Sequence, residues 1–113
     1  MTSPQSLQKP KKPKLPFAIR RVSGRSMEPT LLNGQLVVVW RWAKPRPGSV
    51  VVVHHNGLEK IKRIQDVKDG QIYLLGDNPL KSTDSRQFGW LPVSHVQGRV
   101  VGRRLNQPEQ RIN

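Results

Sequence analysis

Short runs of Val, Ile and Leu, separated by Gly, Pro, Asn and Asp, make up most of the chain after residue 16. Runs of this kind, bounded by turn residues, are typical of β-strands. No stretch shows the period of about 3.6 residues that marks an amphipathic helix, so we expect at most one helical turn, near Pro29. The predicted strands cover residues 17–23, 35–42, 49–55, 58–66, 71–76 and 96–104.

Turn-forming residues lie between these runs. Asn56-Gly57 separates two of them closely enough for a tight hairpin, and Asn33-Gly34, Asp69-Gly70 and residues 45–48 are further turn signals. Many short strands joined by such turns favour a barrel or a sandwich. The pattern therefore predicts an all-β fold, a small and only partly closed β-barrel, over residues 17–106.

The two ends of the chain differ from this pattern. Residues 1–16 hold prolines at positions 4, 10, 13 and 16 and four lysines between Lys9 and Lys14. A segment so rich in proline and charge cannot bury a core, so we expect a disordered basic tail. Residues 107–113 are expected to form a short C-terminal tail.

Charge and composition narrow the range of functions. The net charge of +13 favours an acidic partner, which the basic tail could attract. Nucleic acid is not expected, because no aromatic residues alternate with the basic ones. Cysteine is absent, which excludes disulfides and thiol chemistry. No apolar stretch approaches the roughly 18 residues of a membrane span, so we expect a soluble, cytoplasmic protein without an anchor, a metal or a cofactor.

The segment around Ser26 carries the first candidate chemistry. A predicted strand runs into Gly24, and Pro29 fixes the turn that follows the serine. Such a transition can hold a hydroxyl at the surface and direct backbone N–H groups at one point, as an oxyanion hole requires. We expect Gly24, Arg25 and Met27 to contact a substrate. The alternative is that Ser26 only caps the turn.

A nucleophilic serine needs a base. The three histidines, His54, His55 and His95, have no recognisable partner spacing and are expected at the surface. A lysine can serve if burial lowers its pKa. In the strand 58–66, Lys60 and Lys62 alternate onto the same face as Leu58 and Ile64, and the alternation alone does not choose between the two lysines.

A polar segment after the fifth strand is the third candidate. Asp84 and Arg86 could form an ion pair there, and Ser82 or Ser85 could hydrogen-bond a base. A metal site built from Asp77, Asn78 and Asp84 lacks the remaining ligands of a calcium loop. The alternative is an ordinary surface loop.

Together the three segments resemble the type I signal peptidase family. Residues 26–31 read Ser-Met-Glu-Pro-Thr-Leu, like the family's nucleophile box, and residues 61–64 read Ile-Lys-Arg-Ile, like its Lys-Arg box. Gly-Asp-Asn at 76–78, followed by Ser82 and by Asp-Ser-Arg at 84–86, resembles its third box. The resemblance covers about residues 19–102.

The resemblance implies a role for each matching residue. Ser26 would be the nucleophile and its backbone N–H an oxyanion donor, while Lys62 rather than Lys60 would be the general base. Ser82 would orient Lys62. The residues that would hold the third segment are Asp77, Asp84, Ser85 and Arg86, of which Asp84 and Arg86 would pair.

Three departures from the family narrow the expected substrate. Gly24 stands where some members have a serine, the large inserted domain of the bacterial enzymes is absent, and no membrane anchor is found. Short members without an anchor resemble the maturation protease of nickel-type superoxide dismutase, which removes an N-terminal propeptide. The predicted partner is therefore a soluble precursor polypeptide, nickel superoxide dismutase.

Other functions remain open at this point. One alternative is general, signal-peptidase-like processing of exported proteins. Another is a non-catalytic basic module that binds nucleic acid or an acidic membrane through residues 9–25. A third is a self-cleaving repressor domain, although residues 1–16 hold no helix-turn-helix.

Overall fold

The computed structural model describes residues 15–104 of the 113-residue chain. The predicted C-terminal tail, and all but the last two residues of the predicted N-terminal tail, lie outside the described residues. Within the described residues the first strand begins at Phe17.

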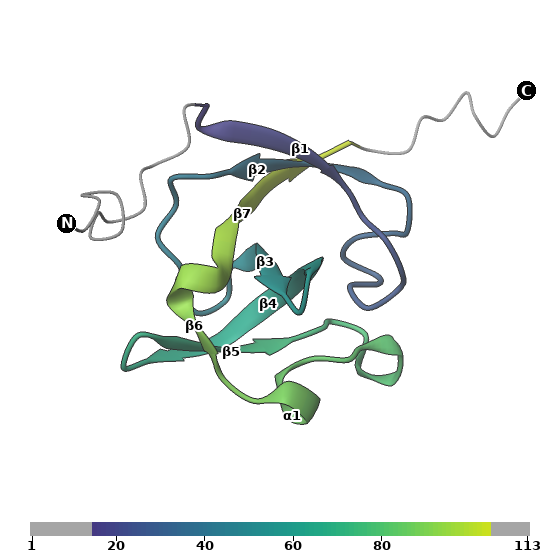
Figure 1. The fold of residues 1–113 in the computed structure, drawn as a ribbon. Helices are drawn as coiled ribbons and strands as arrows, with labels where there is room; N and C mark the ends of the chain where they lie inside the picture. The colour runs from purple at the N-terminus through teal and green to yellow at the C-terminus, as the bar shows by residue number, and fades with distance from the viewer. Residues whose placement is uncertain (1–14, 105–113) are drawn as a thin grey trace, which may run out of the picture.

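The fold is all-β, as predicted. Its strands form one antiparallel 7-stranded sheet in the order β1-β2-β7-β3-β4-β5-β6, curled into a barrel that is not fully closed (Figure 1). The strands are β1 (Phe17–Arg21), β2 (Leu36–Trp40), β3 (Val50–His55), β4 (Leu58–Lys68), β5 (Gln71–Leu75), β6 (Leu91–Pro92) and β7 (Val96–Arg103). The short helices are η2 (Pro79–Lys81), α1 (Ser85–Phe88) and η3 (Val93–His95).

Two hairpins follow the turn signals of the sequence. The β3–β4 hairpin turns at Asn56-Gly57, with φ of 52° and 77°, and the β4–β5 hairpin at Asp69-Gly70, with φ of 51° and 75°. Positive φ at both central residues matches the strand twist, and Asn-Gly and Asp-Gly tolerate it best. These two turns therefore fix how β4, the strand that carries Lys62, pairs with its neighbours.

The sequence missed the smaller elements. β6 has only two residues, and α1 is a single turn of four. Segments this short have no period that a pattern could show. The helical turn expected near Pro29 is a hydrogen-bonded turn, in which Leu31 N–H donates to the Met27 carbonyl at 2.9 Å. No helix in residues 15–104 is long and apolar enough to cross a membrane.

Two apolar clusters hold the sheet together, and alternate residues of β3 serve each of them. Val52 packs in the first cluster and Val51 and Val53 in the second. The first also contains Val22, Met27, Leu31, Val37 and Val39. The second also contains Ile64, Ile72, Leu74 and Leu91. The segment after Ser26 is thus anchored to the first cluster, and the strand of Lys62 to the second.

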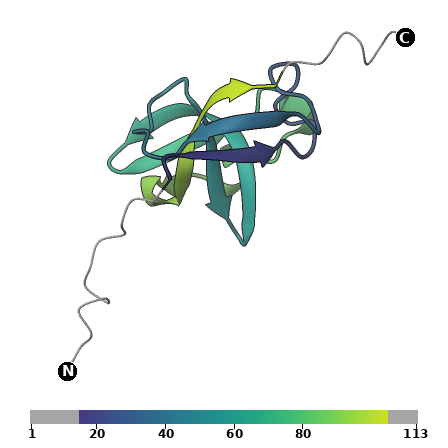
Figure 2. The ribbon, with the colours of Figure 1, turned by 90° about the horizontal axis from the view of Figure 1, so that it is seen from above.

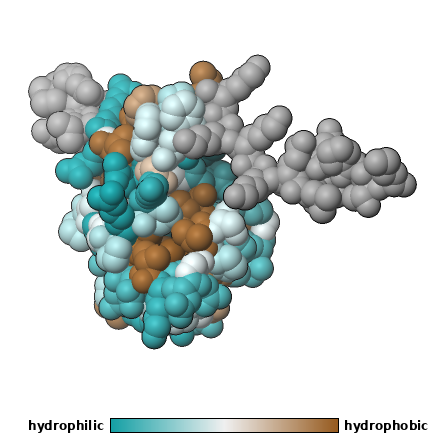
Figure 3. Space-filling view, turned by 90° about the vertical axis from the view of Figure 1, so that its left-hand side faces the viewer, coloured by the Kyte–Doolittle hydropathy of each residue, from teal (hydrophilic) through white to brown (hydrophobic). Residues whose placement is uncertain are grey.

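The views from other sides show what these clusters leave outside. From above, β1 and β2 lie across the direction of β3 and β4 (Figure 2). On the face seen in Figure 3, hydrophobic side chains gather in a band across an otherwise mostly hydrophilic surface. The exposed large apolar residues include Phe17 and Ile19 of β1, so this edge strand is not covered by the described chain.

Candidate active site

Ser26 lies in the connection between β1 and β2, directly before the residues that anchor this segment. Gly24, two residues earlier, has a φ of +89°, a conformation that glycine adopts without strain. Its N–H donates to Asn33 Oδ1 at 2.8 Å, and apart from its two chain neighbours no atom of the described residues lies within 4 Å of the place where a Cβ would stand. The backbone before the serine is therefore both fixed and open to an approaching chain.

Ser26 and Lys62 line one surface groove of about 260 Å³. One wall comes from the end of β1 and the residues after it, and the other from residues 58–62 of β4. Arg20 and Glu59 join the two walls through an ion pair, with Nε and Oε1 2.8 Å apart. The sheet thus brings together two residues that are far apart in the sequence. We call this cavity the Ser26–Lys62 groove.

Lys62 is the buried lysine of β4, with only 5% of its surface exposed. Burial lowers the pKa of Lys62, and the nearby charges of Lys60 and Arg86 lower it further, while the Asp84 carboxylate opposes the shift. Its Nζ donates to Ser82 Oγ at 3.2 Å. Within residues 15–104 the Ser26 hydroxyl has no hydrogen-bond partner, so a direct Ser26–Lys62 hydrogen bond is not formed.

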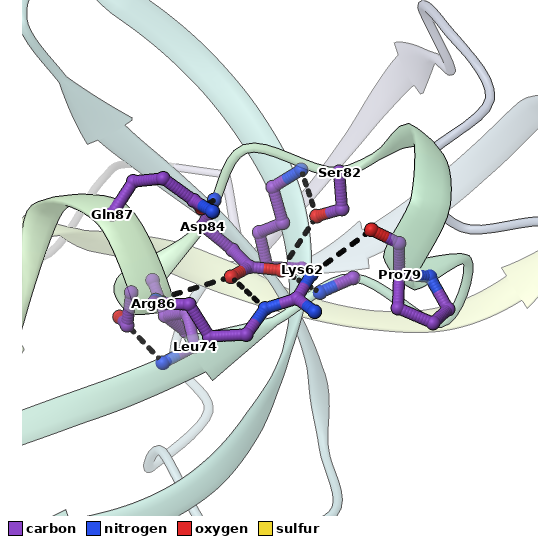
Figure 4. Close-up of polar contacts among 9 residues, drawn as sticks. Lys62, Leu74, Pro79, Ser82, Asp84, Arg86 and Gln87 are labelled. Atoms are coloured by element: carbon purple, nitrogen blue, oxygen red, sulfur yellow. Dashed lines mark hydrogen bonds and ion pairs between the residues drawn. The ribbon is translucent and has the colours of Figure 1, made fainter.

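A chain of hydrogen bonds leads from Lys62 into the third segment (Figure 4). Ser82 Oγ accepts from Lys62 and donates to Asp84 Oδ2 at 2.6 Å. Arg86 donates to both oxygens of Asp84, from Nε at 2.9 Å and from NH2 at 3.0 Å. The pairing of Asp84 with Arg86 and the placement of Ser82 beside Lys62 thus have the geometry that the resemblance implied.

Asp84 is fully buried, and its carboxylate accepts hydrogen bonds from Arg86, Ser82 and the Gly76 N–H. Burial by itself would raise the pKa of Asp84, but hydrogen bonds from Arg86, from the Gly76 N–H and from Ser82 outweigh it and hold that pKa well below its ordinary value. Asp84 also caps the first turn of α1, where the Asp84 N–H in turn donates to Gln87 Oε1 at 2.9 Å. The carboxylate therefore stays ionised and fixes the position of Ser82.

Ser85 and Asp77 support the same segment from two directions. Ser85 Oγ accepts a hydrogen bond from the Leu74 N–H of β5 at 2.8 Å. Asp77 accepts from Arg63 Nε and NH2, at 2.9 and 2.8 Å, and from Thr30 Oγ1 at 2.6 Å. The Arg63 guanidinium holds the pKa of Asp77 below its ordinary value. Because Thr30 follows Ser26 in the same turn, Asp77 connects the serine segment to β4.

Residues 76–78 also hold the Ser26 backbone directly. Asn78 N–H donates to the Ser26 carbonyl at 2.8 Å, and Asn78 Nδ2 donates to the Arg25 carbonyl at 3.0 Å. Gly76 lies between Ser82 and the Ser26 backbone: a Cβ at this position would stand 2.2 Å from Ser82 Oγ and 2.7 Å from the Ser26 carbonyl oxygen. The serine segment and the serine–aspartate pair approach so closely only because residue 76 has no side chain.

Gly76→Ala is therefore expected to lower the cleavage rate by roughly tenfold or more, because the added methyl group pushes the Ser26 backbone or Ser82 from its place. Steady-state cleavage of a peptide substrate, with the melting temperature recorded in parallel, measures the effect. The matched control is Gly102→Ala, where the nearest atom, Val38 Cβ, would lie at 3.9 Å. Equal activity of the two variants would contradict the argument.

The alternative bases have different surroundings from Lys62. Lys60 also lines the Ser26–Lys62 groove, but its Nζ lies 4.9 Å from the centre of the Phe88 ring. None of the three histidines lines this groove. The carboxylates of the alternative metal site are each bound to an arginine, Asp77 to Arg63 and Asp84 to Arg86. No group of three ligand-type side chains within residues 15–104 could hold a metal ion.

The three residues expected to contact a substrate have different environments. Gly24 and Arg25 are exposed, and Arg25 pairs with Glu28 at 3.0 Å. The Met27 side chain, however, is only 1% exposed and packs in the first apolar cluster. The Met27 side chain therefore anchors the turn beside Ser26, and its contact with a substrate stays a prediction.

Sequence reasoning assigned no role to Gly76, Thr30 or Arg63, and it considered Asn78 only as a ligand of the alternative metal site. All four lie inside the three matched boxes, so the signal was present in the sequence. Their roles depend on contacts between segments that are distant along the chain, such as Thr30 with Asp77. A pattern within one segment does not show these contacts.

Comparison with known proteins adds the family. A family model described as Peptidase S24-like matches residues 2–110, nearly the whole chain. No curated protein matches the sequence. The match supports the serine-peptidase type of function expected from the three boxes, whereas the assignment to nickel superoxide dismutase maturation stays a prediction. The chain belongs to the Peptidase S24-like family.

Proposed function

We propose that the protein is a serine endopeptidase in which Ser26 is the nucleophile and Lys62 the general base. One observation carries this proposal: the two residues line the same groove, and the lysine is buried and oriented by Ser82 and Asp84. A lysine whose pKa is lowered by burial can be neutral at working pH, and only the neutral amine can accept a proton.

The arrangement supports acyl transfer in two steps. Lys62 Nζ takes the proton of Ser26 Oγ as this oxygen bonds to the scissile carbonyl carbon, and the ammonium then protonates the leaving amine as the C–N bond breaks. A water molecule, deprotonated by the same amine, attacks the acyl-enzyme, and Ser26 leaves with its proton restored. Ser82 keeps the lysine in place through both steps, because its hydroxyl donates to Asp84 and accepts from Lys62.

The oxyanion of these steps needs donors. Within the described residues the Ser26 N–H has no acceptor, so it is free to donate to the developing charge. Gly24 provides no side-chain donor. We assign the Ser26 N–H as the principal donor in this chain, in place of the side-chain donor found in some related enzymes.

An extended peptide fits the shape of this groove. β1 is an edge strand of the sheet, and the residues that follow it form one wall of the groove up to Ser26. Main-chain pairing along such an edge accepts many sequences and presents alternate side chains to the wall. The open space beside Gly24 leaves room for the substrate backbone close to the nucleophile.

For the substrate we propose the N-terminal propeptide of a soluble precursor, nickel superoxide dismutase, processed in the cytoplasm. The support is the resemblance to the short maturation proteases, which share the three boxes and lack an inserted domain. Between Lys62 and Gly76 this chain has only the remainder of β4, a tight turn and β5, with no room for an inserted domain.

Co-expression with that precursor tests the proposal. Wild type is expected to yield the trimmed N-terminus by mass measurement, and Ser26→Ala to leave the precursor whole. Incubating the wild-type protein alone monitors self-cleavage. If the wild-type protein leaves the precursor whole but cuts a membrane-protein leader, general signal-peptidase-like processing replaces the maturation function. Cleavage by Ser26→Ala at the wild-type rate would refute the nucleophile.

A further inference from the structure

A second cavity, of about 340 Å³, lies apart from the Ser26–Lys62 groove and shares no lining residue with it. Arg63 of β4 and Arg99 and Arg103 of β7 line it, together with residues 30–31, 48–50 and 100–102. We call it the arginine cavity. Arg63 follows Lys62 on β4, and neighbouring residues of a strand point to opposite faces, so the side chains of Lys62 and Arg63 leave this strand on different sides.

The charge of the arginine cavity is not balanced. None of its lining residues is acidic. Arg63 is already bound, to Asp77 and, through NH1, to the Gly48 carbonyl at 2.7 Å. Within residues 15–104 neither Arg99 nor Arg103 has an ion-pair partner. The guanidinium groups of Arg99 and Arg103, which have no ion-pair partner among these residues, therefore line the same cavity as Arg63. Its volume is large enough for a group of several atoms.

We propose that the arginine cavity is a binding site for an oxoanion. The flat fork of a guanidinium matches the paired oxygens of carboxylates and phosphates, and several such forks around one hollow are typical of sites for these groups. The oxoanion has two candidate sources: a free phosphate-type anion, or an acidic side chain of the bound precursor. The first does not depend on the proposed function, and the second rests on it.

The position of the arginine cavity predicts how a bound anion affects the protein. Thr30 and Arg63 line the cavity and both bind Asp77, which holds the turn after Ser26. An anion there lies behind the serine segment and outside the Ser26–Lys62 groove. Binding therefore stabilises the folded protein by mass action without competing with a short peptide for the groove.

Melting curves of the full-length protein in increasing inorganic phosphate, at constant ionic strength, test the free-anion source. The melting temperature of wild type should rise by several degrees over the titration, and Arg99→Gln/Arg103→Gln should lose most of that rise. Lys68→Gln, which removes an exposed charge at the far end of β4, is the matched control and should keep it. The single variants Arg99→Gln and Arg103→Gln serve if the double variant does not fold.

Cleavage kinetics test the other source. If the precursor supplies the carboxylate, the double variant should raise KM for the whole precursor by about tenfold while cleaving a short peptide at the wild-type rate. That peptide rate also separates this result from a failure of the proposed function, which would leave the peptide uncut by the wild-type protein. The proposal is overturned if the double variant keeps both the full phosphate effect and the wild-type KM, or if Lys68→Gln loses as much as the double variant.

Discussion

Lys62→Ala is expected to lower kcat by about a thousandfold or more, whereas Lys60→Ala should stay within a few-fold of wild type. The first change removes the proposed base, and loss of general-base catalysis costs on this order. The second removes an ammonium that lies over the Phe88 ring on the same face of the strand. Both variants replace a lysine on the same face of β4 by alanine, so comparing them on one precursor separates the loss of the base from a general effect of removing a lysine.

The pH profile gives an independent reading of the same residue. Because only neutral Lys62 can accept the proton, kcat/KM should rise with pH as Lys62 deprotonates. Burial lowers the pKa of Lys62 from its ordinary 10.5, so the rise should be centred below that value. Equal loss of activity in the two lysine variants, or a kcat/KM that falls as the pH rises across this range, would contradict the assignment of Lys62 as the general base.

Asp84→Ala is expected to destabilise the fold by about 3 kcal/mol and to lower cleavage by at least an order of magnitude. The change removes a buried acceptor and leaves Ser82, the Gly76 N–H and Arg86 without it. The start of α1 also loses its cap. Urea unfolding measures the first effect and steady-state cleavage the second.

The matched control is Asp66→Ala, which removes an exposed carboxylate of β4 that, among residues 15–104, accepts only from the Val67 N–H beside it. Its stability should stay within about 0.5 kcal/mol of wild type. The pH dependence has a definite sign. Since the pKa of Asp84 is lowered in the folded state, its contribution is present above the ordinary aspartate pKa and is lost as the pH falls through the folded-state value. Wild type should therefore lose more stability than Asp84→Ala at strongly acidic pH.

The sequence predicted most strands of the sheet because each of them has a recognisable pattern in its own residues. Alternation and turn residues marked six of the strands, and Asn56-Gly57 and Asp69-Gly70 take the positive φ angles that such pairs favour. β6 was missed because two residues, Leu91 and Pro92, carry no pattern. Strand order could not be read at all, since pairing between distant segments depends on the packing of the whole barrel.

The candidate site was likewise predictable only where local sequence patterns decide the structure. Alternation along β4 placed Lys60 and Lys62 on one face, but it could not show which of them is buried. Burial depends on the third segment, where Ser82 and Asp84 lie against Lys62. The burial of Met27 was not predicted for a similar reason, because whether a residue beside a surface serine points inward is decided by the first apolar cluster.

The position of β7 in the sheet has a consequence for how the protein folds during its synthesis on the ribosome. Ser26 precedes β2 and Lys62 lies on β4, and β7 pairs with β2 on one side and β3 on the other. Until residues 96–103 have been synthesised, the half that bears Ser26 and the half that bears Lys62 have no strand between them. A nascent chain therefore cannot complete the barrel around the proposed catalytic residues, and we expect proteolytic competence to begin only after the C-terminal strand of the described fold has emerged.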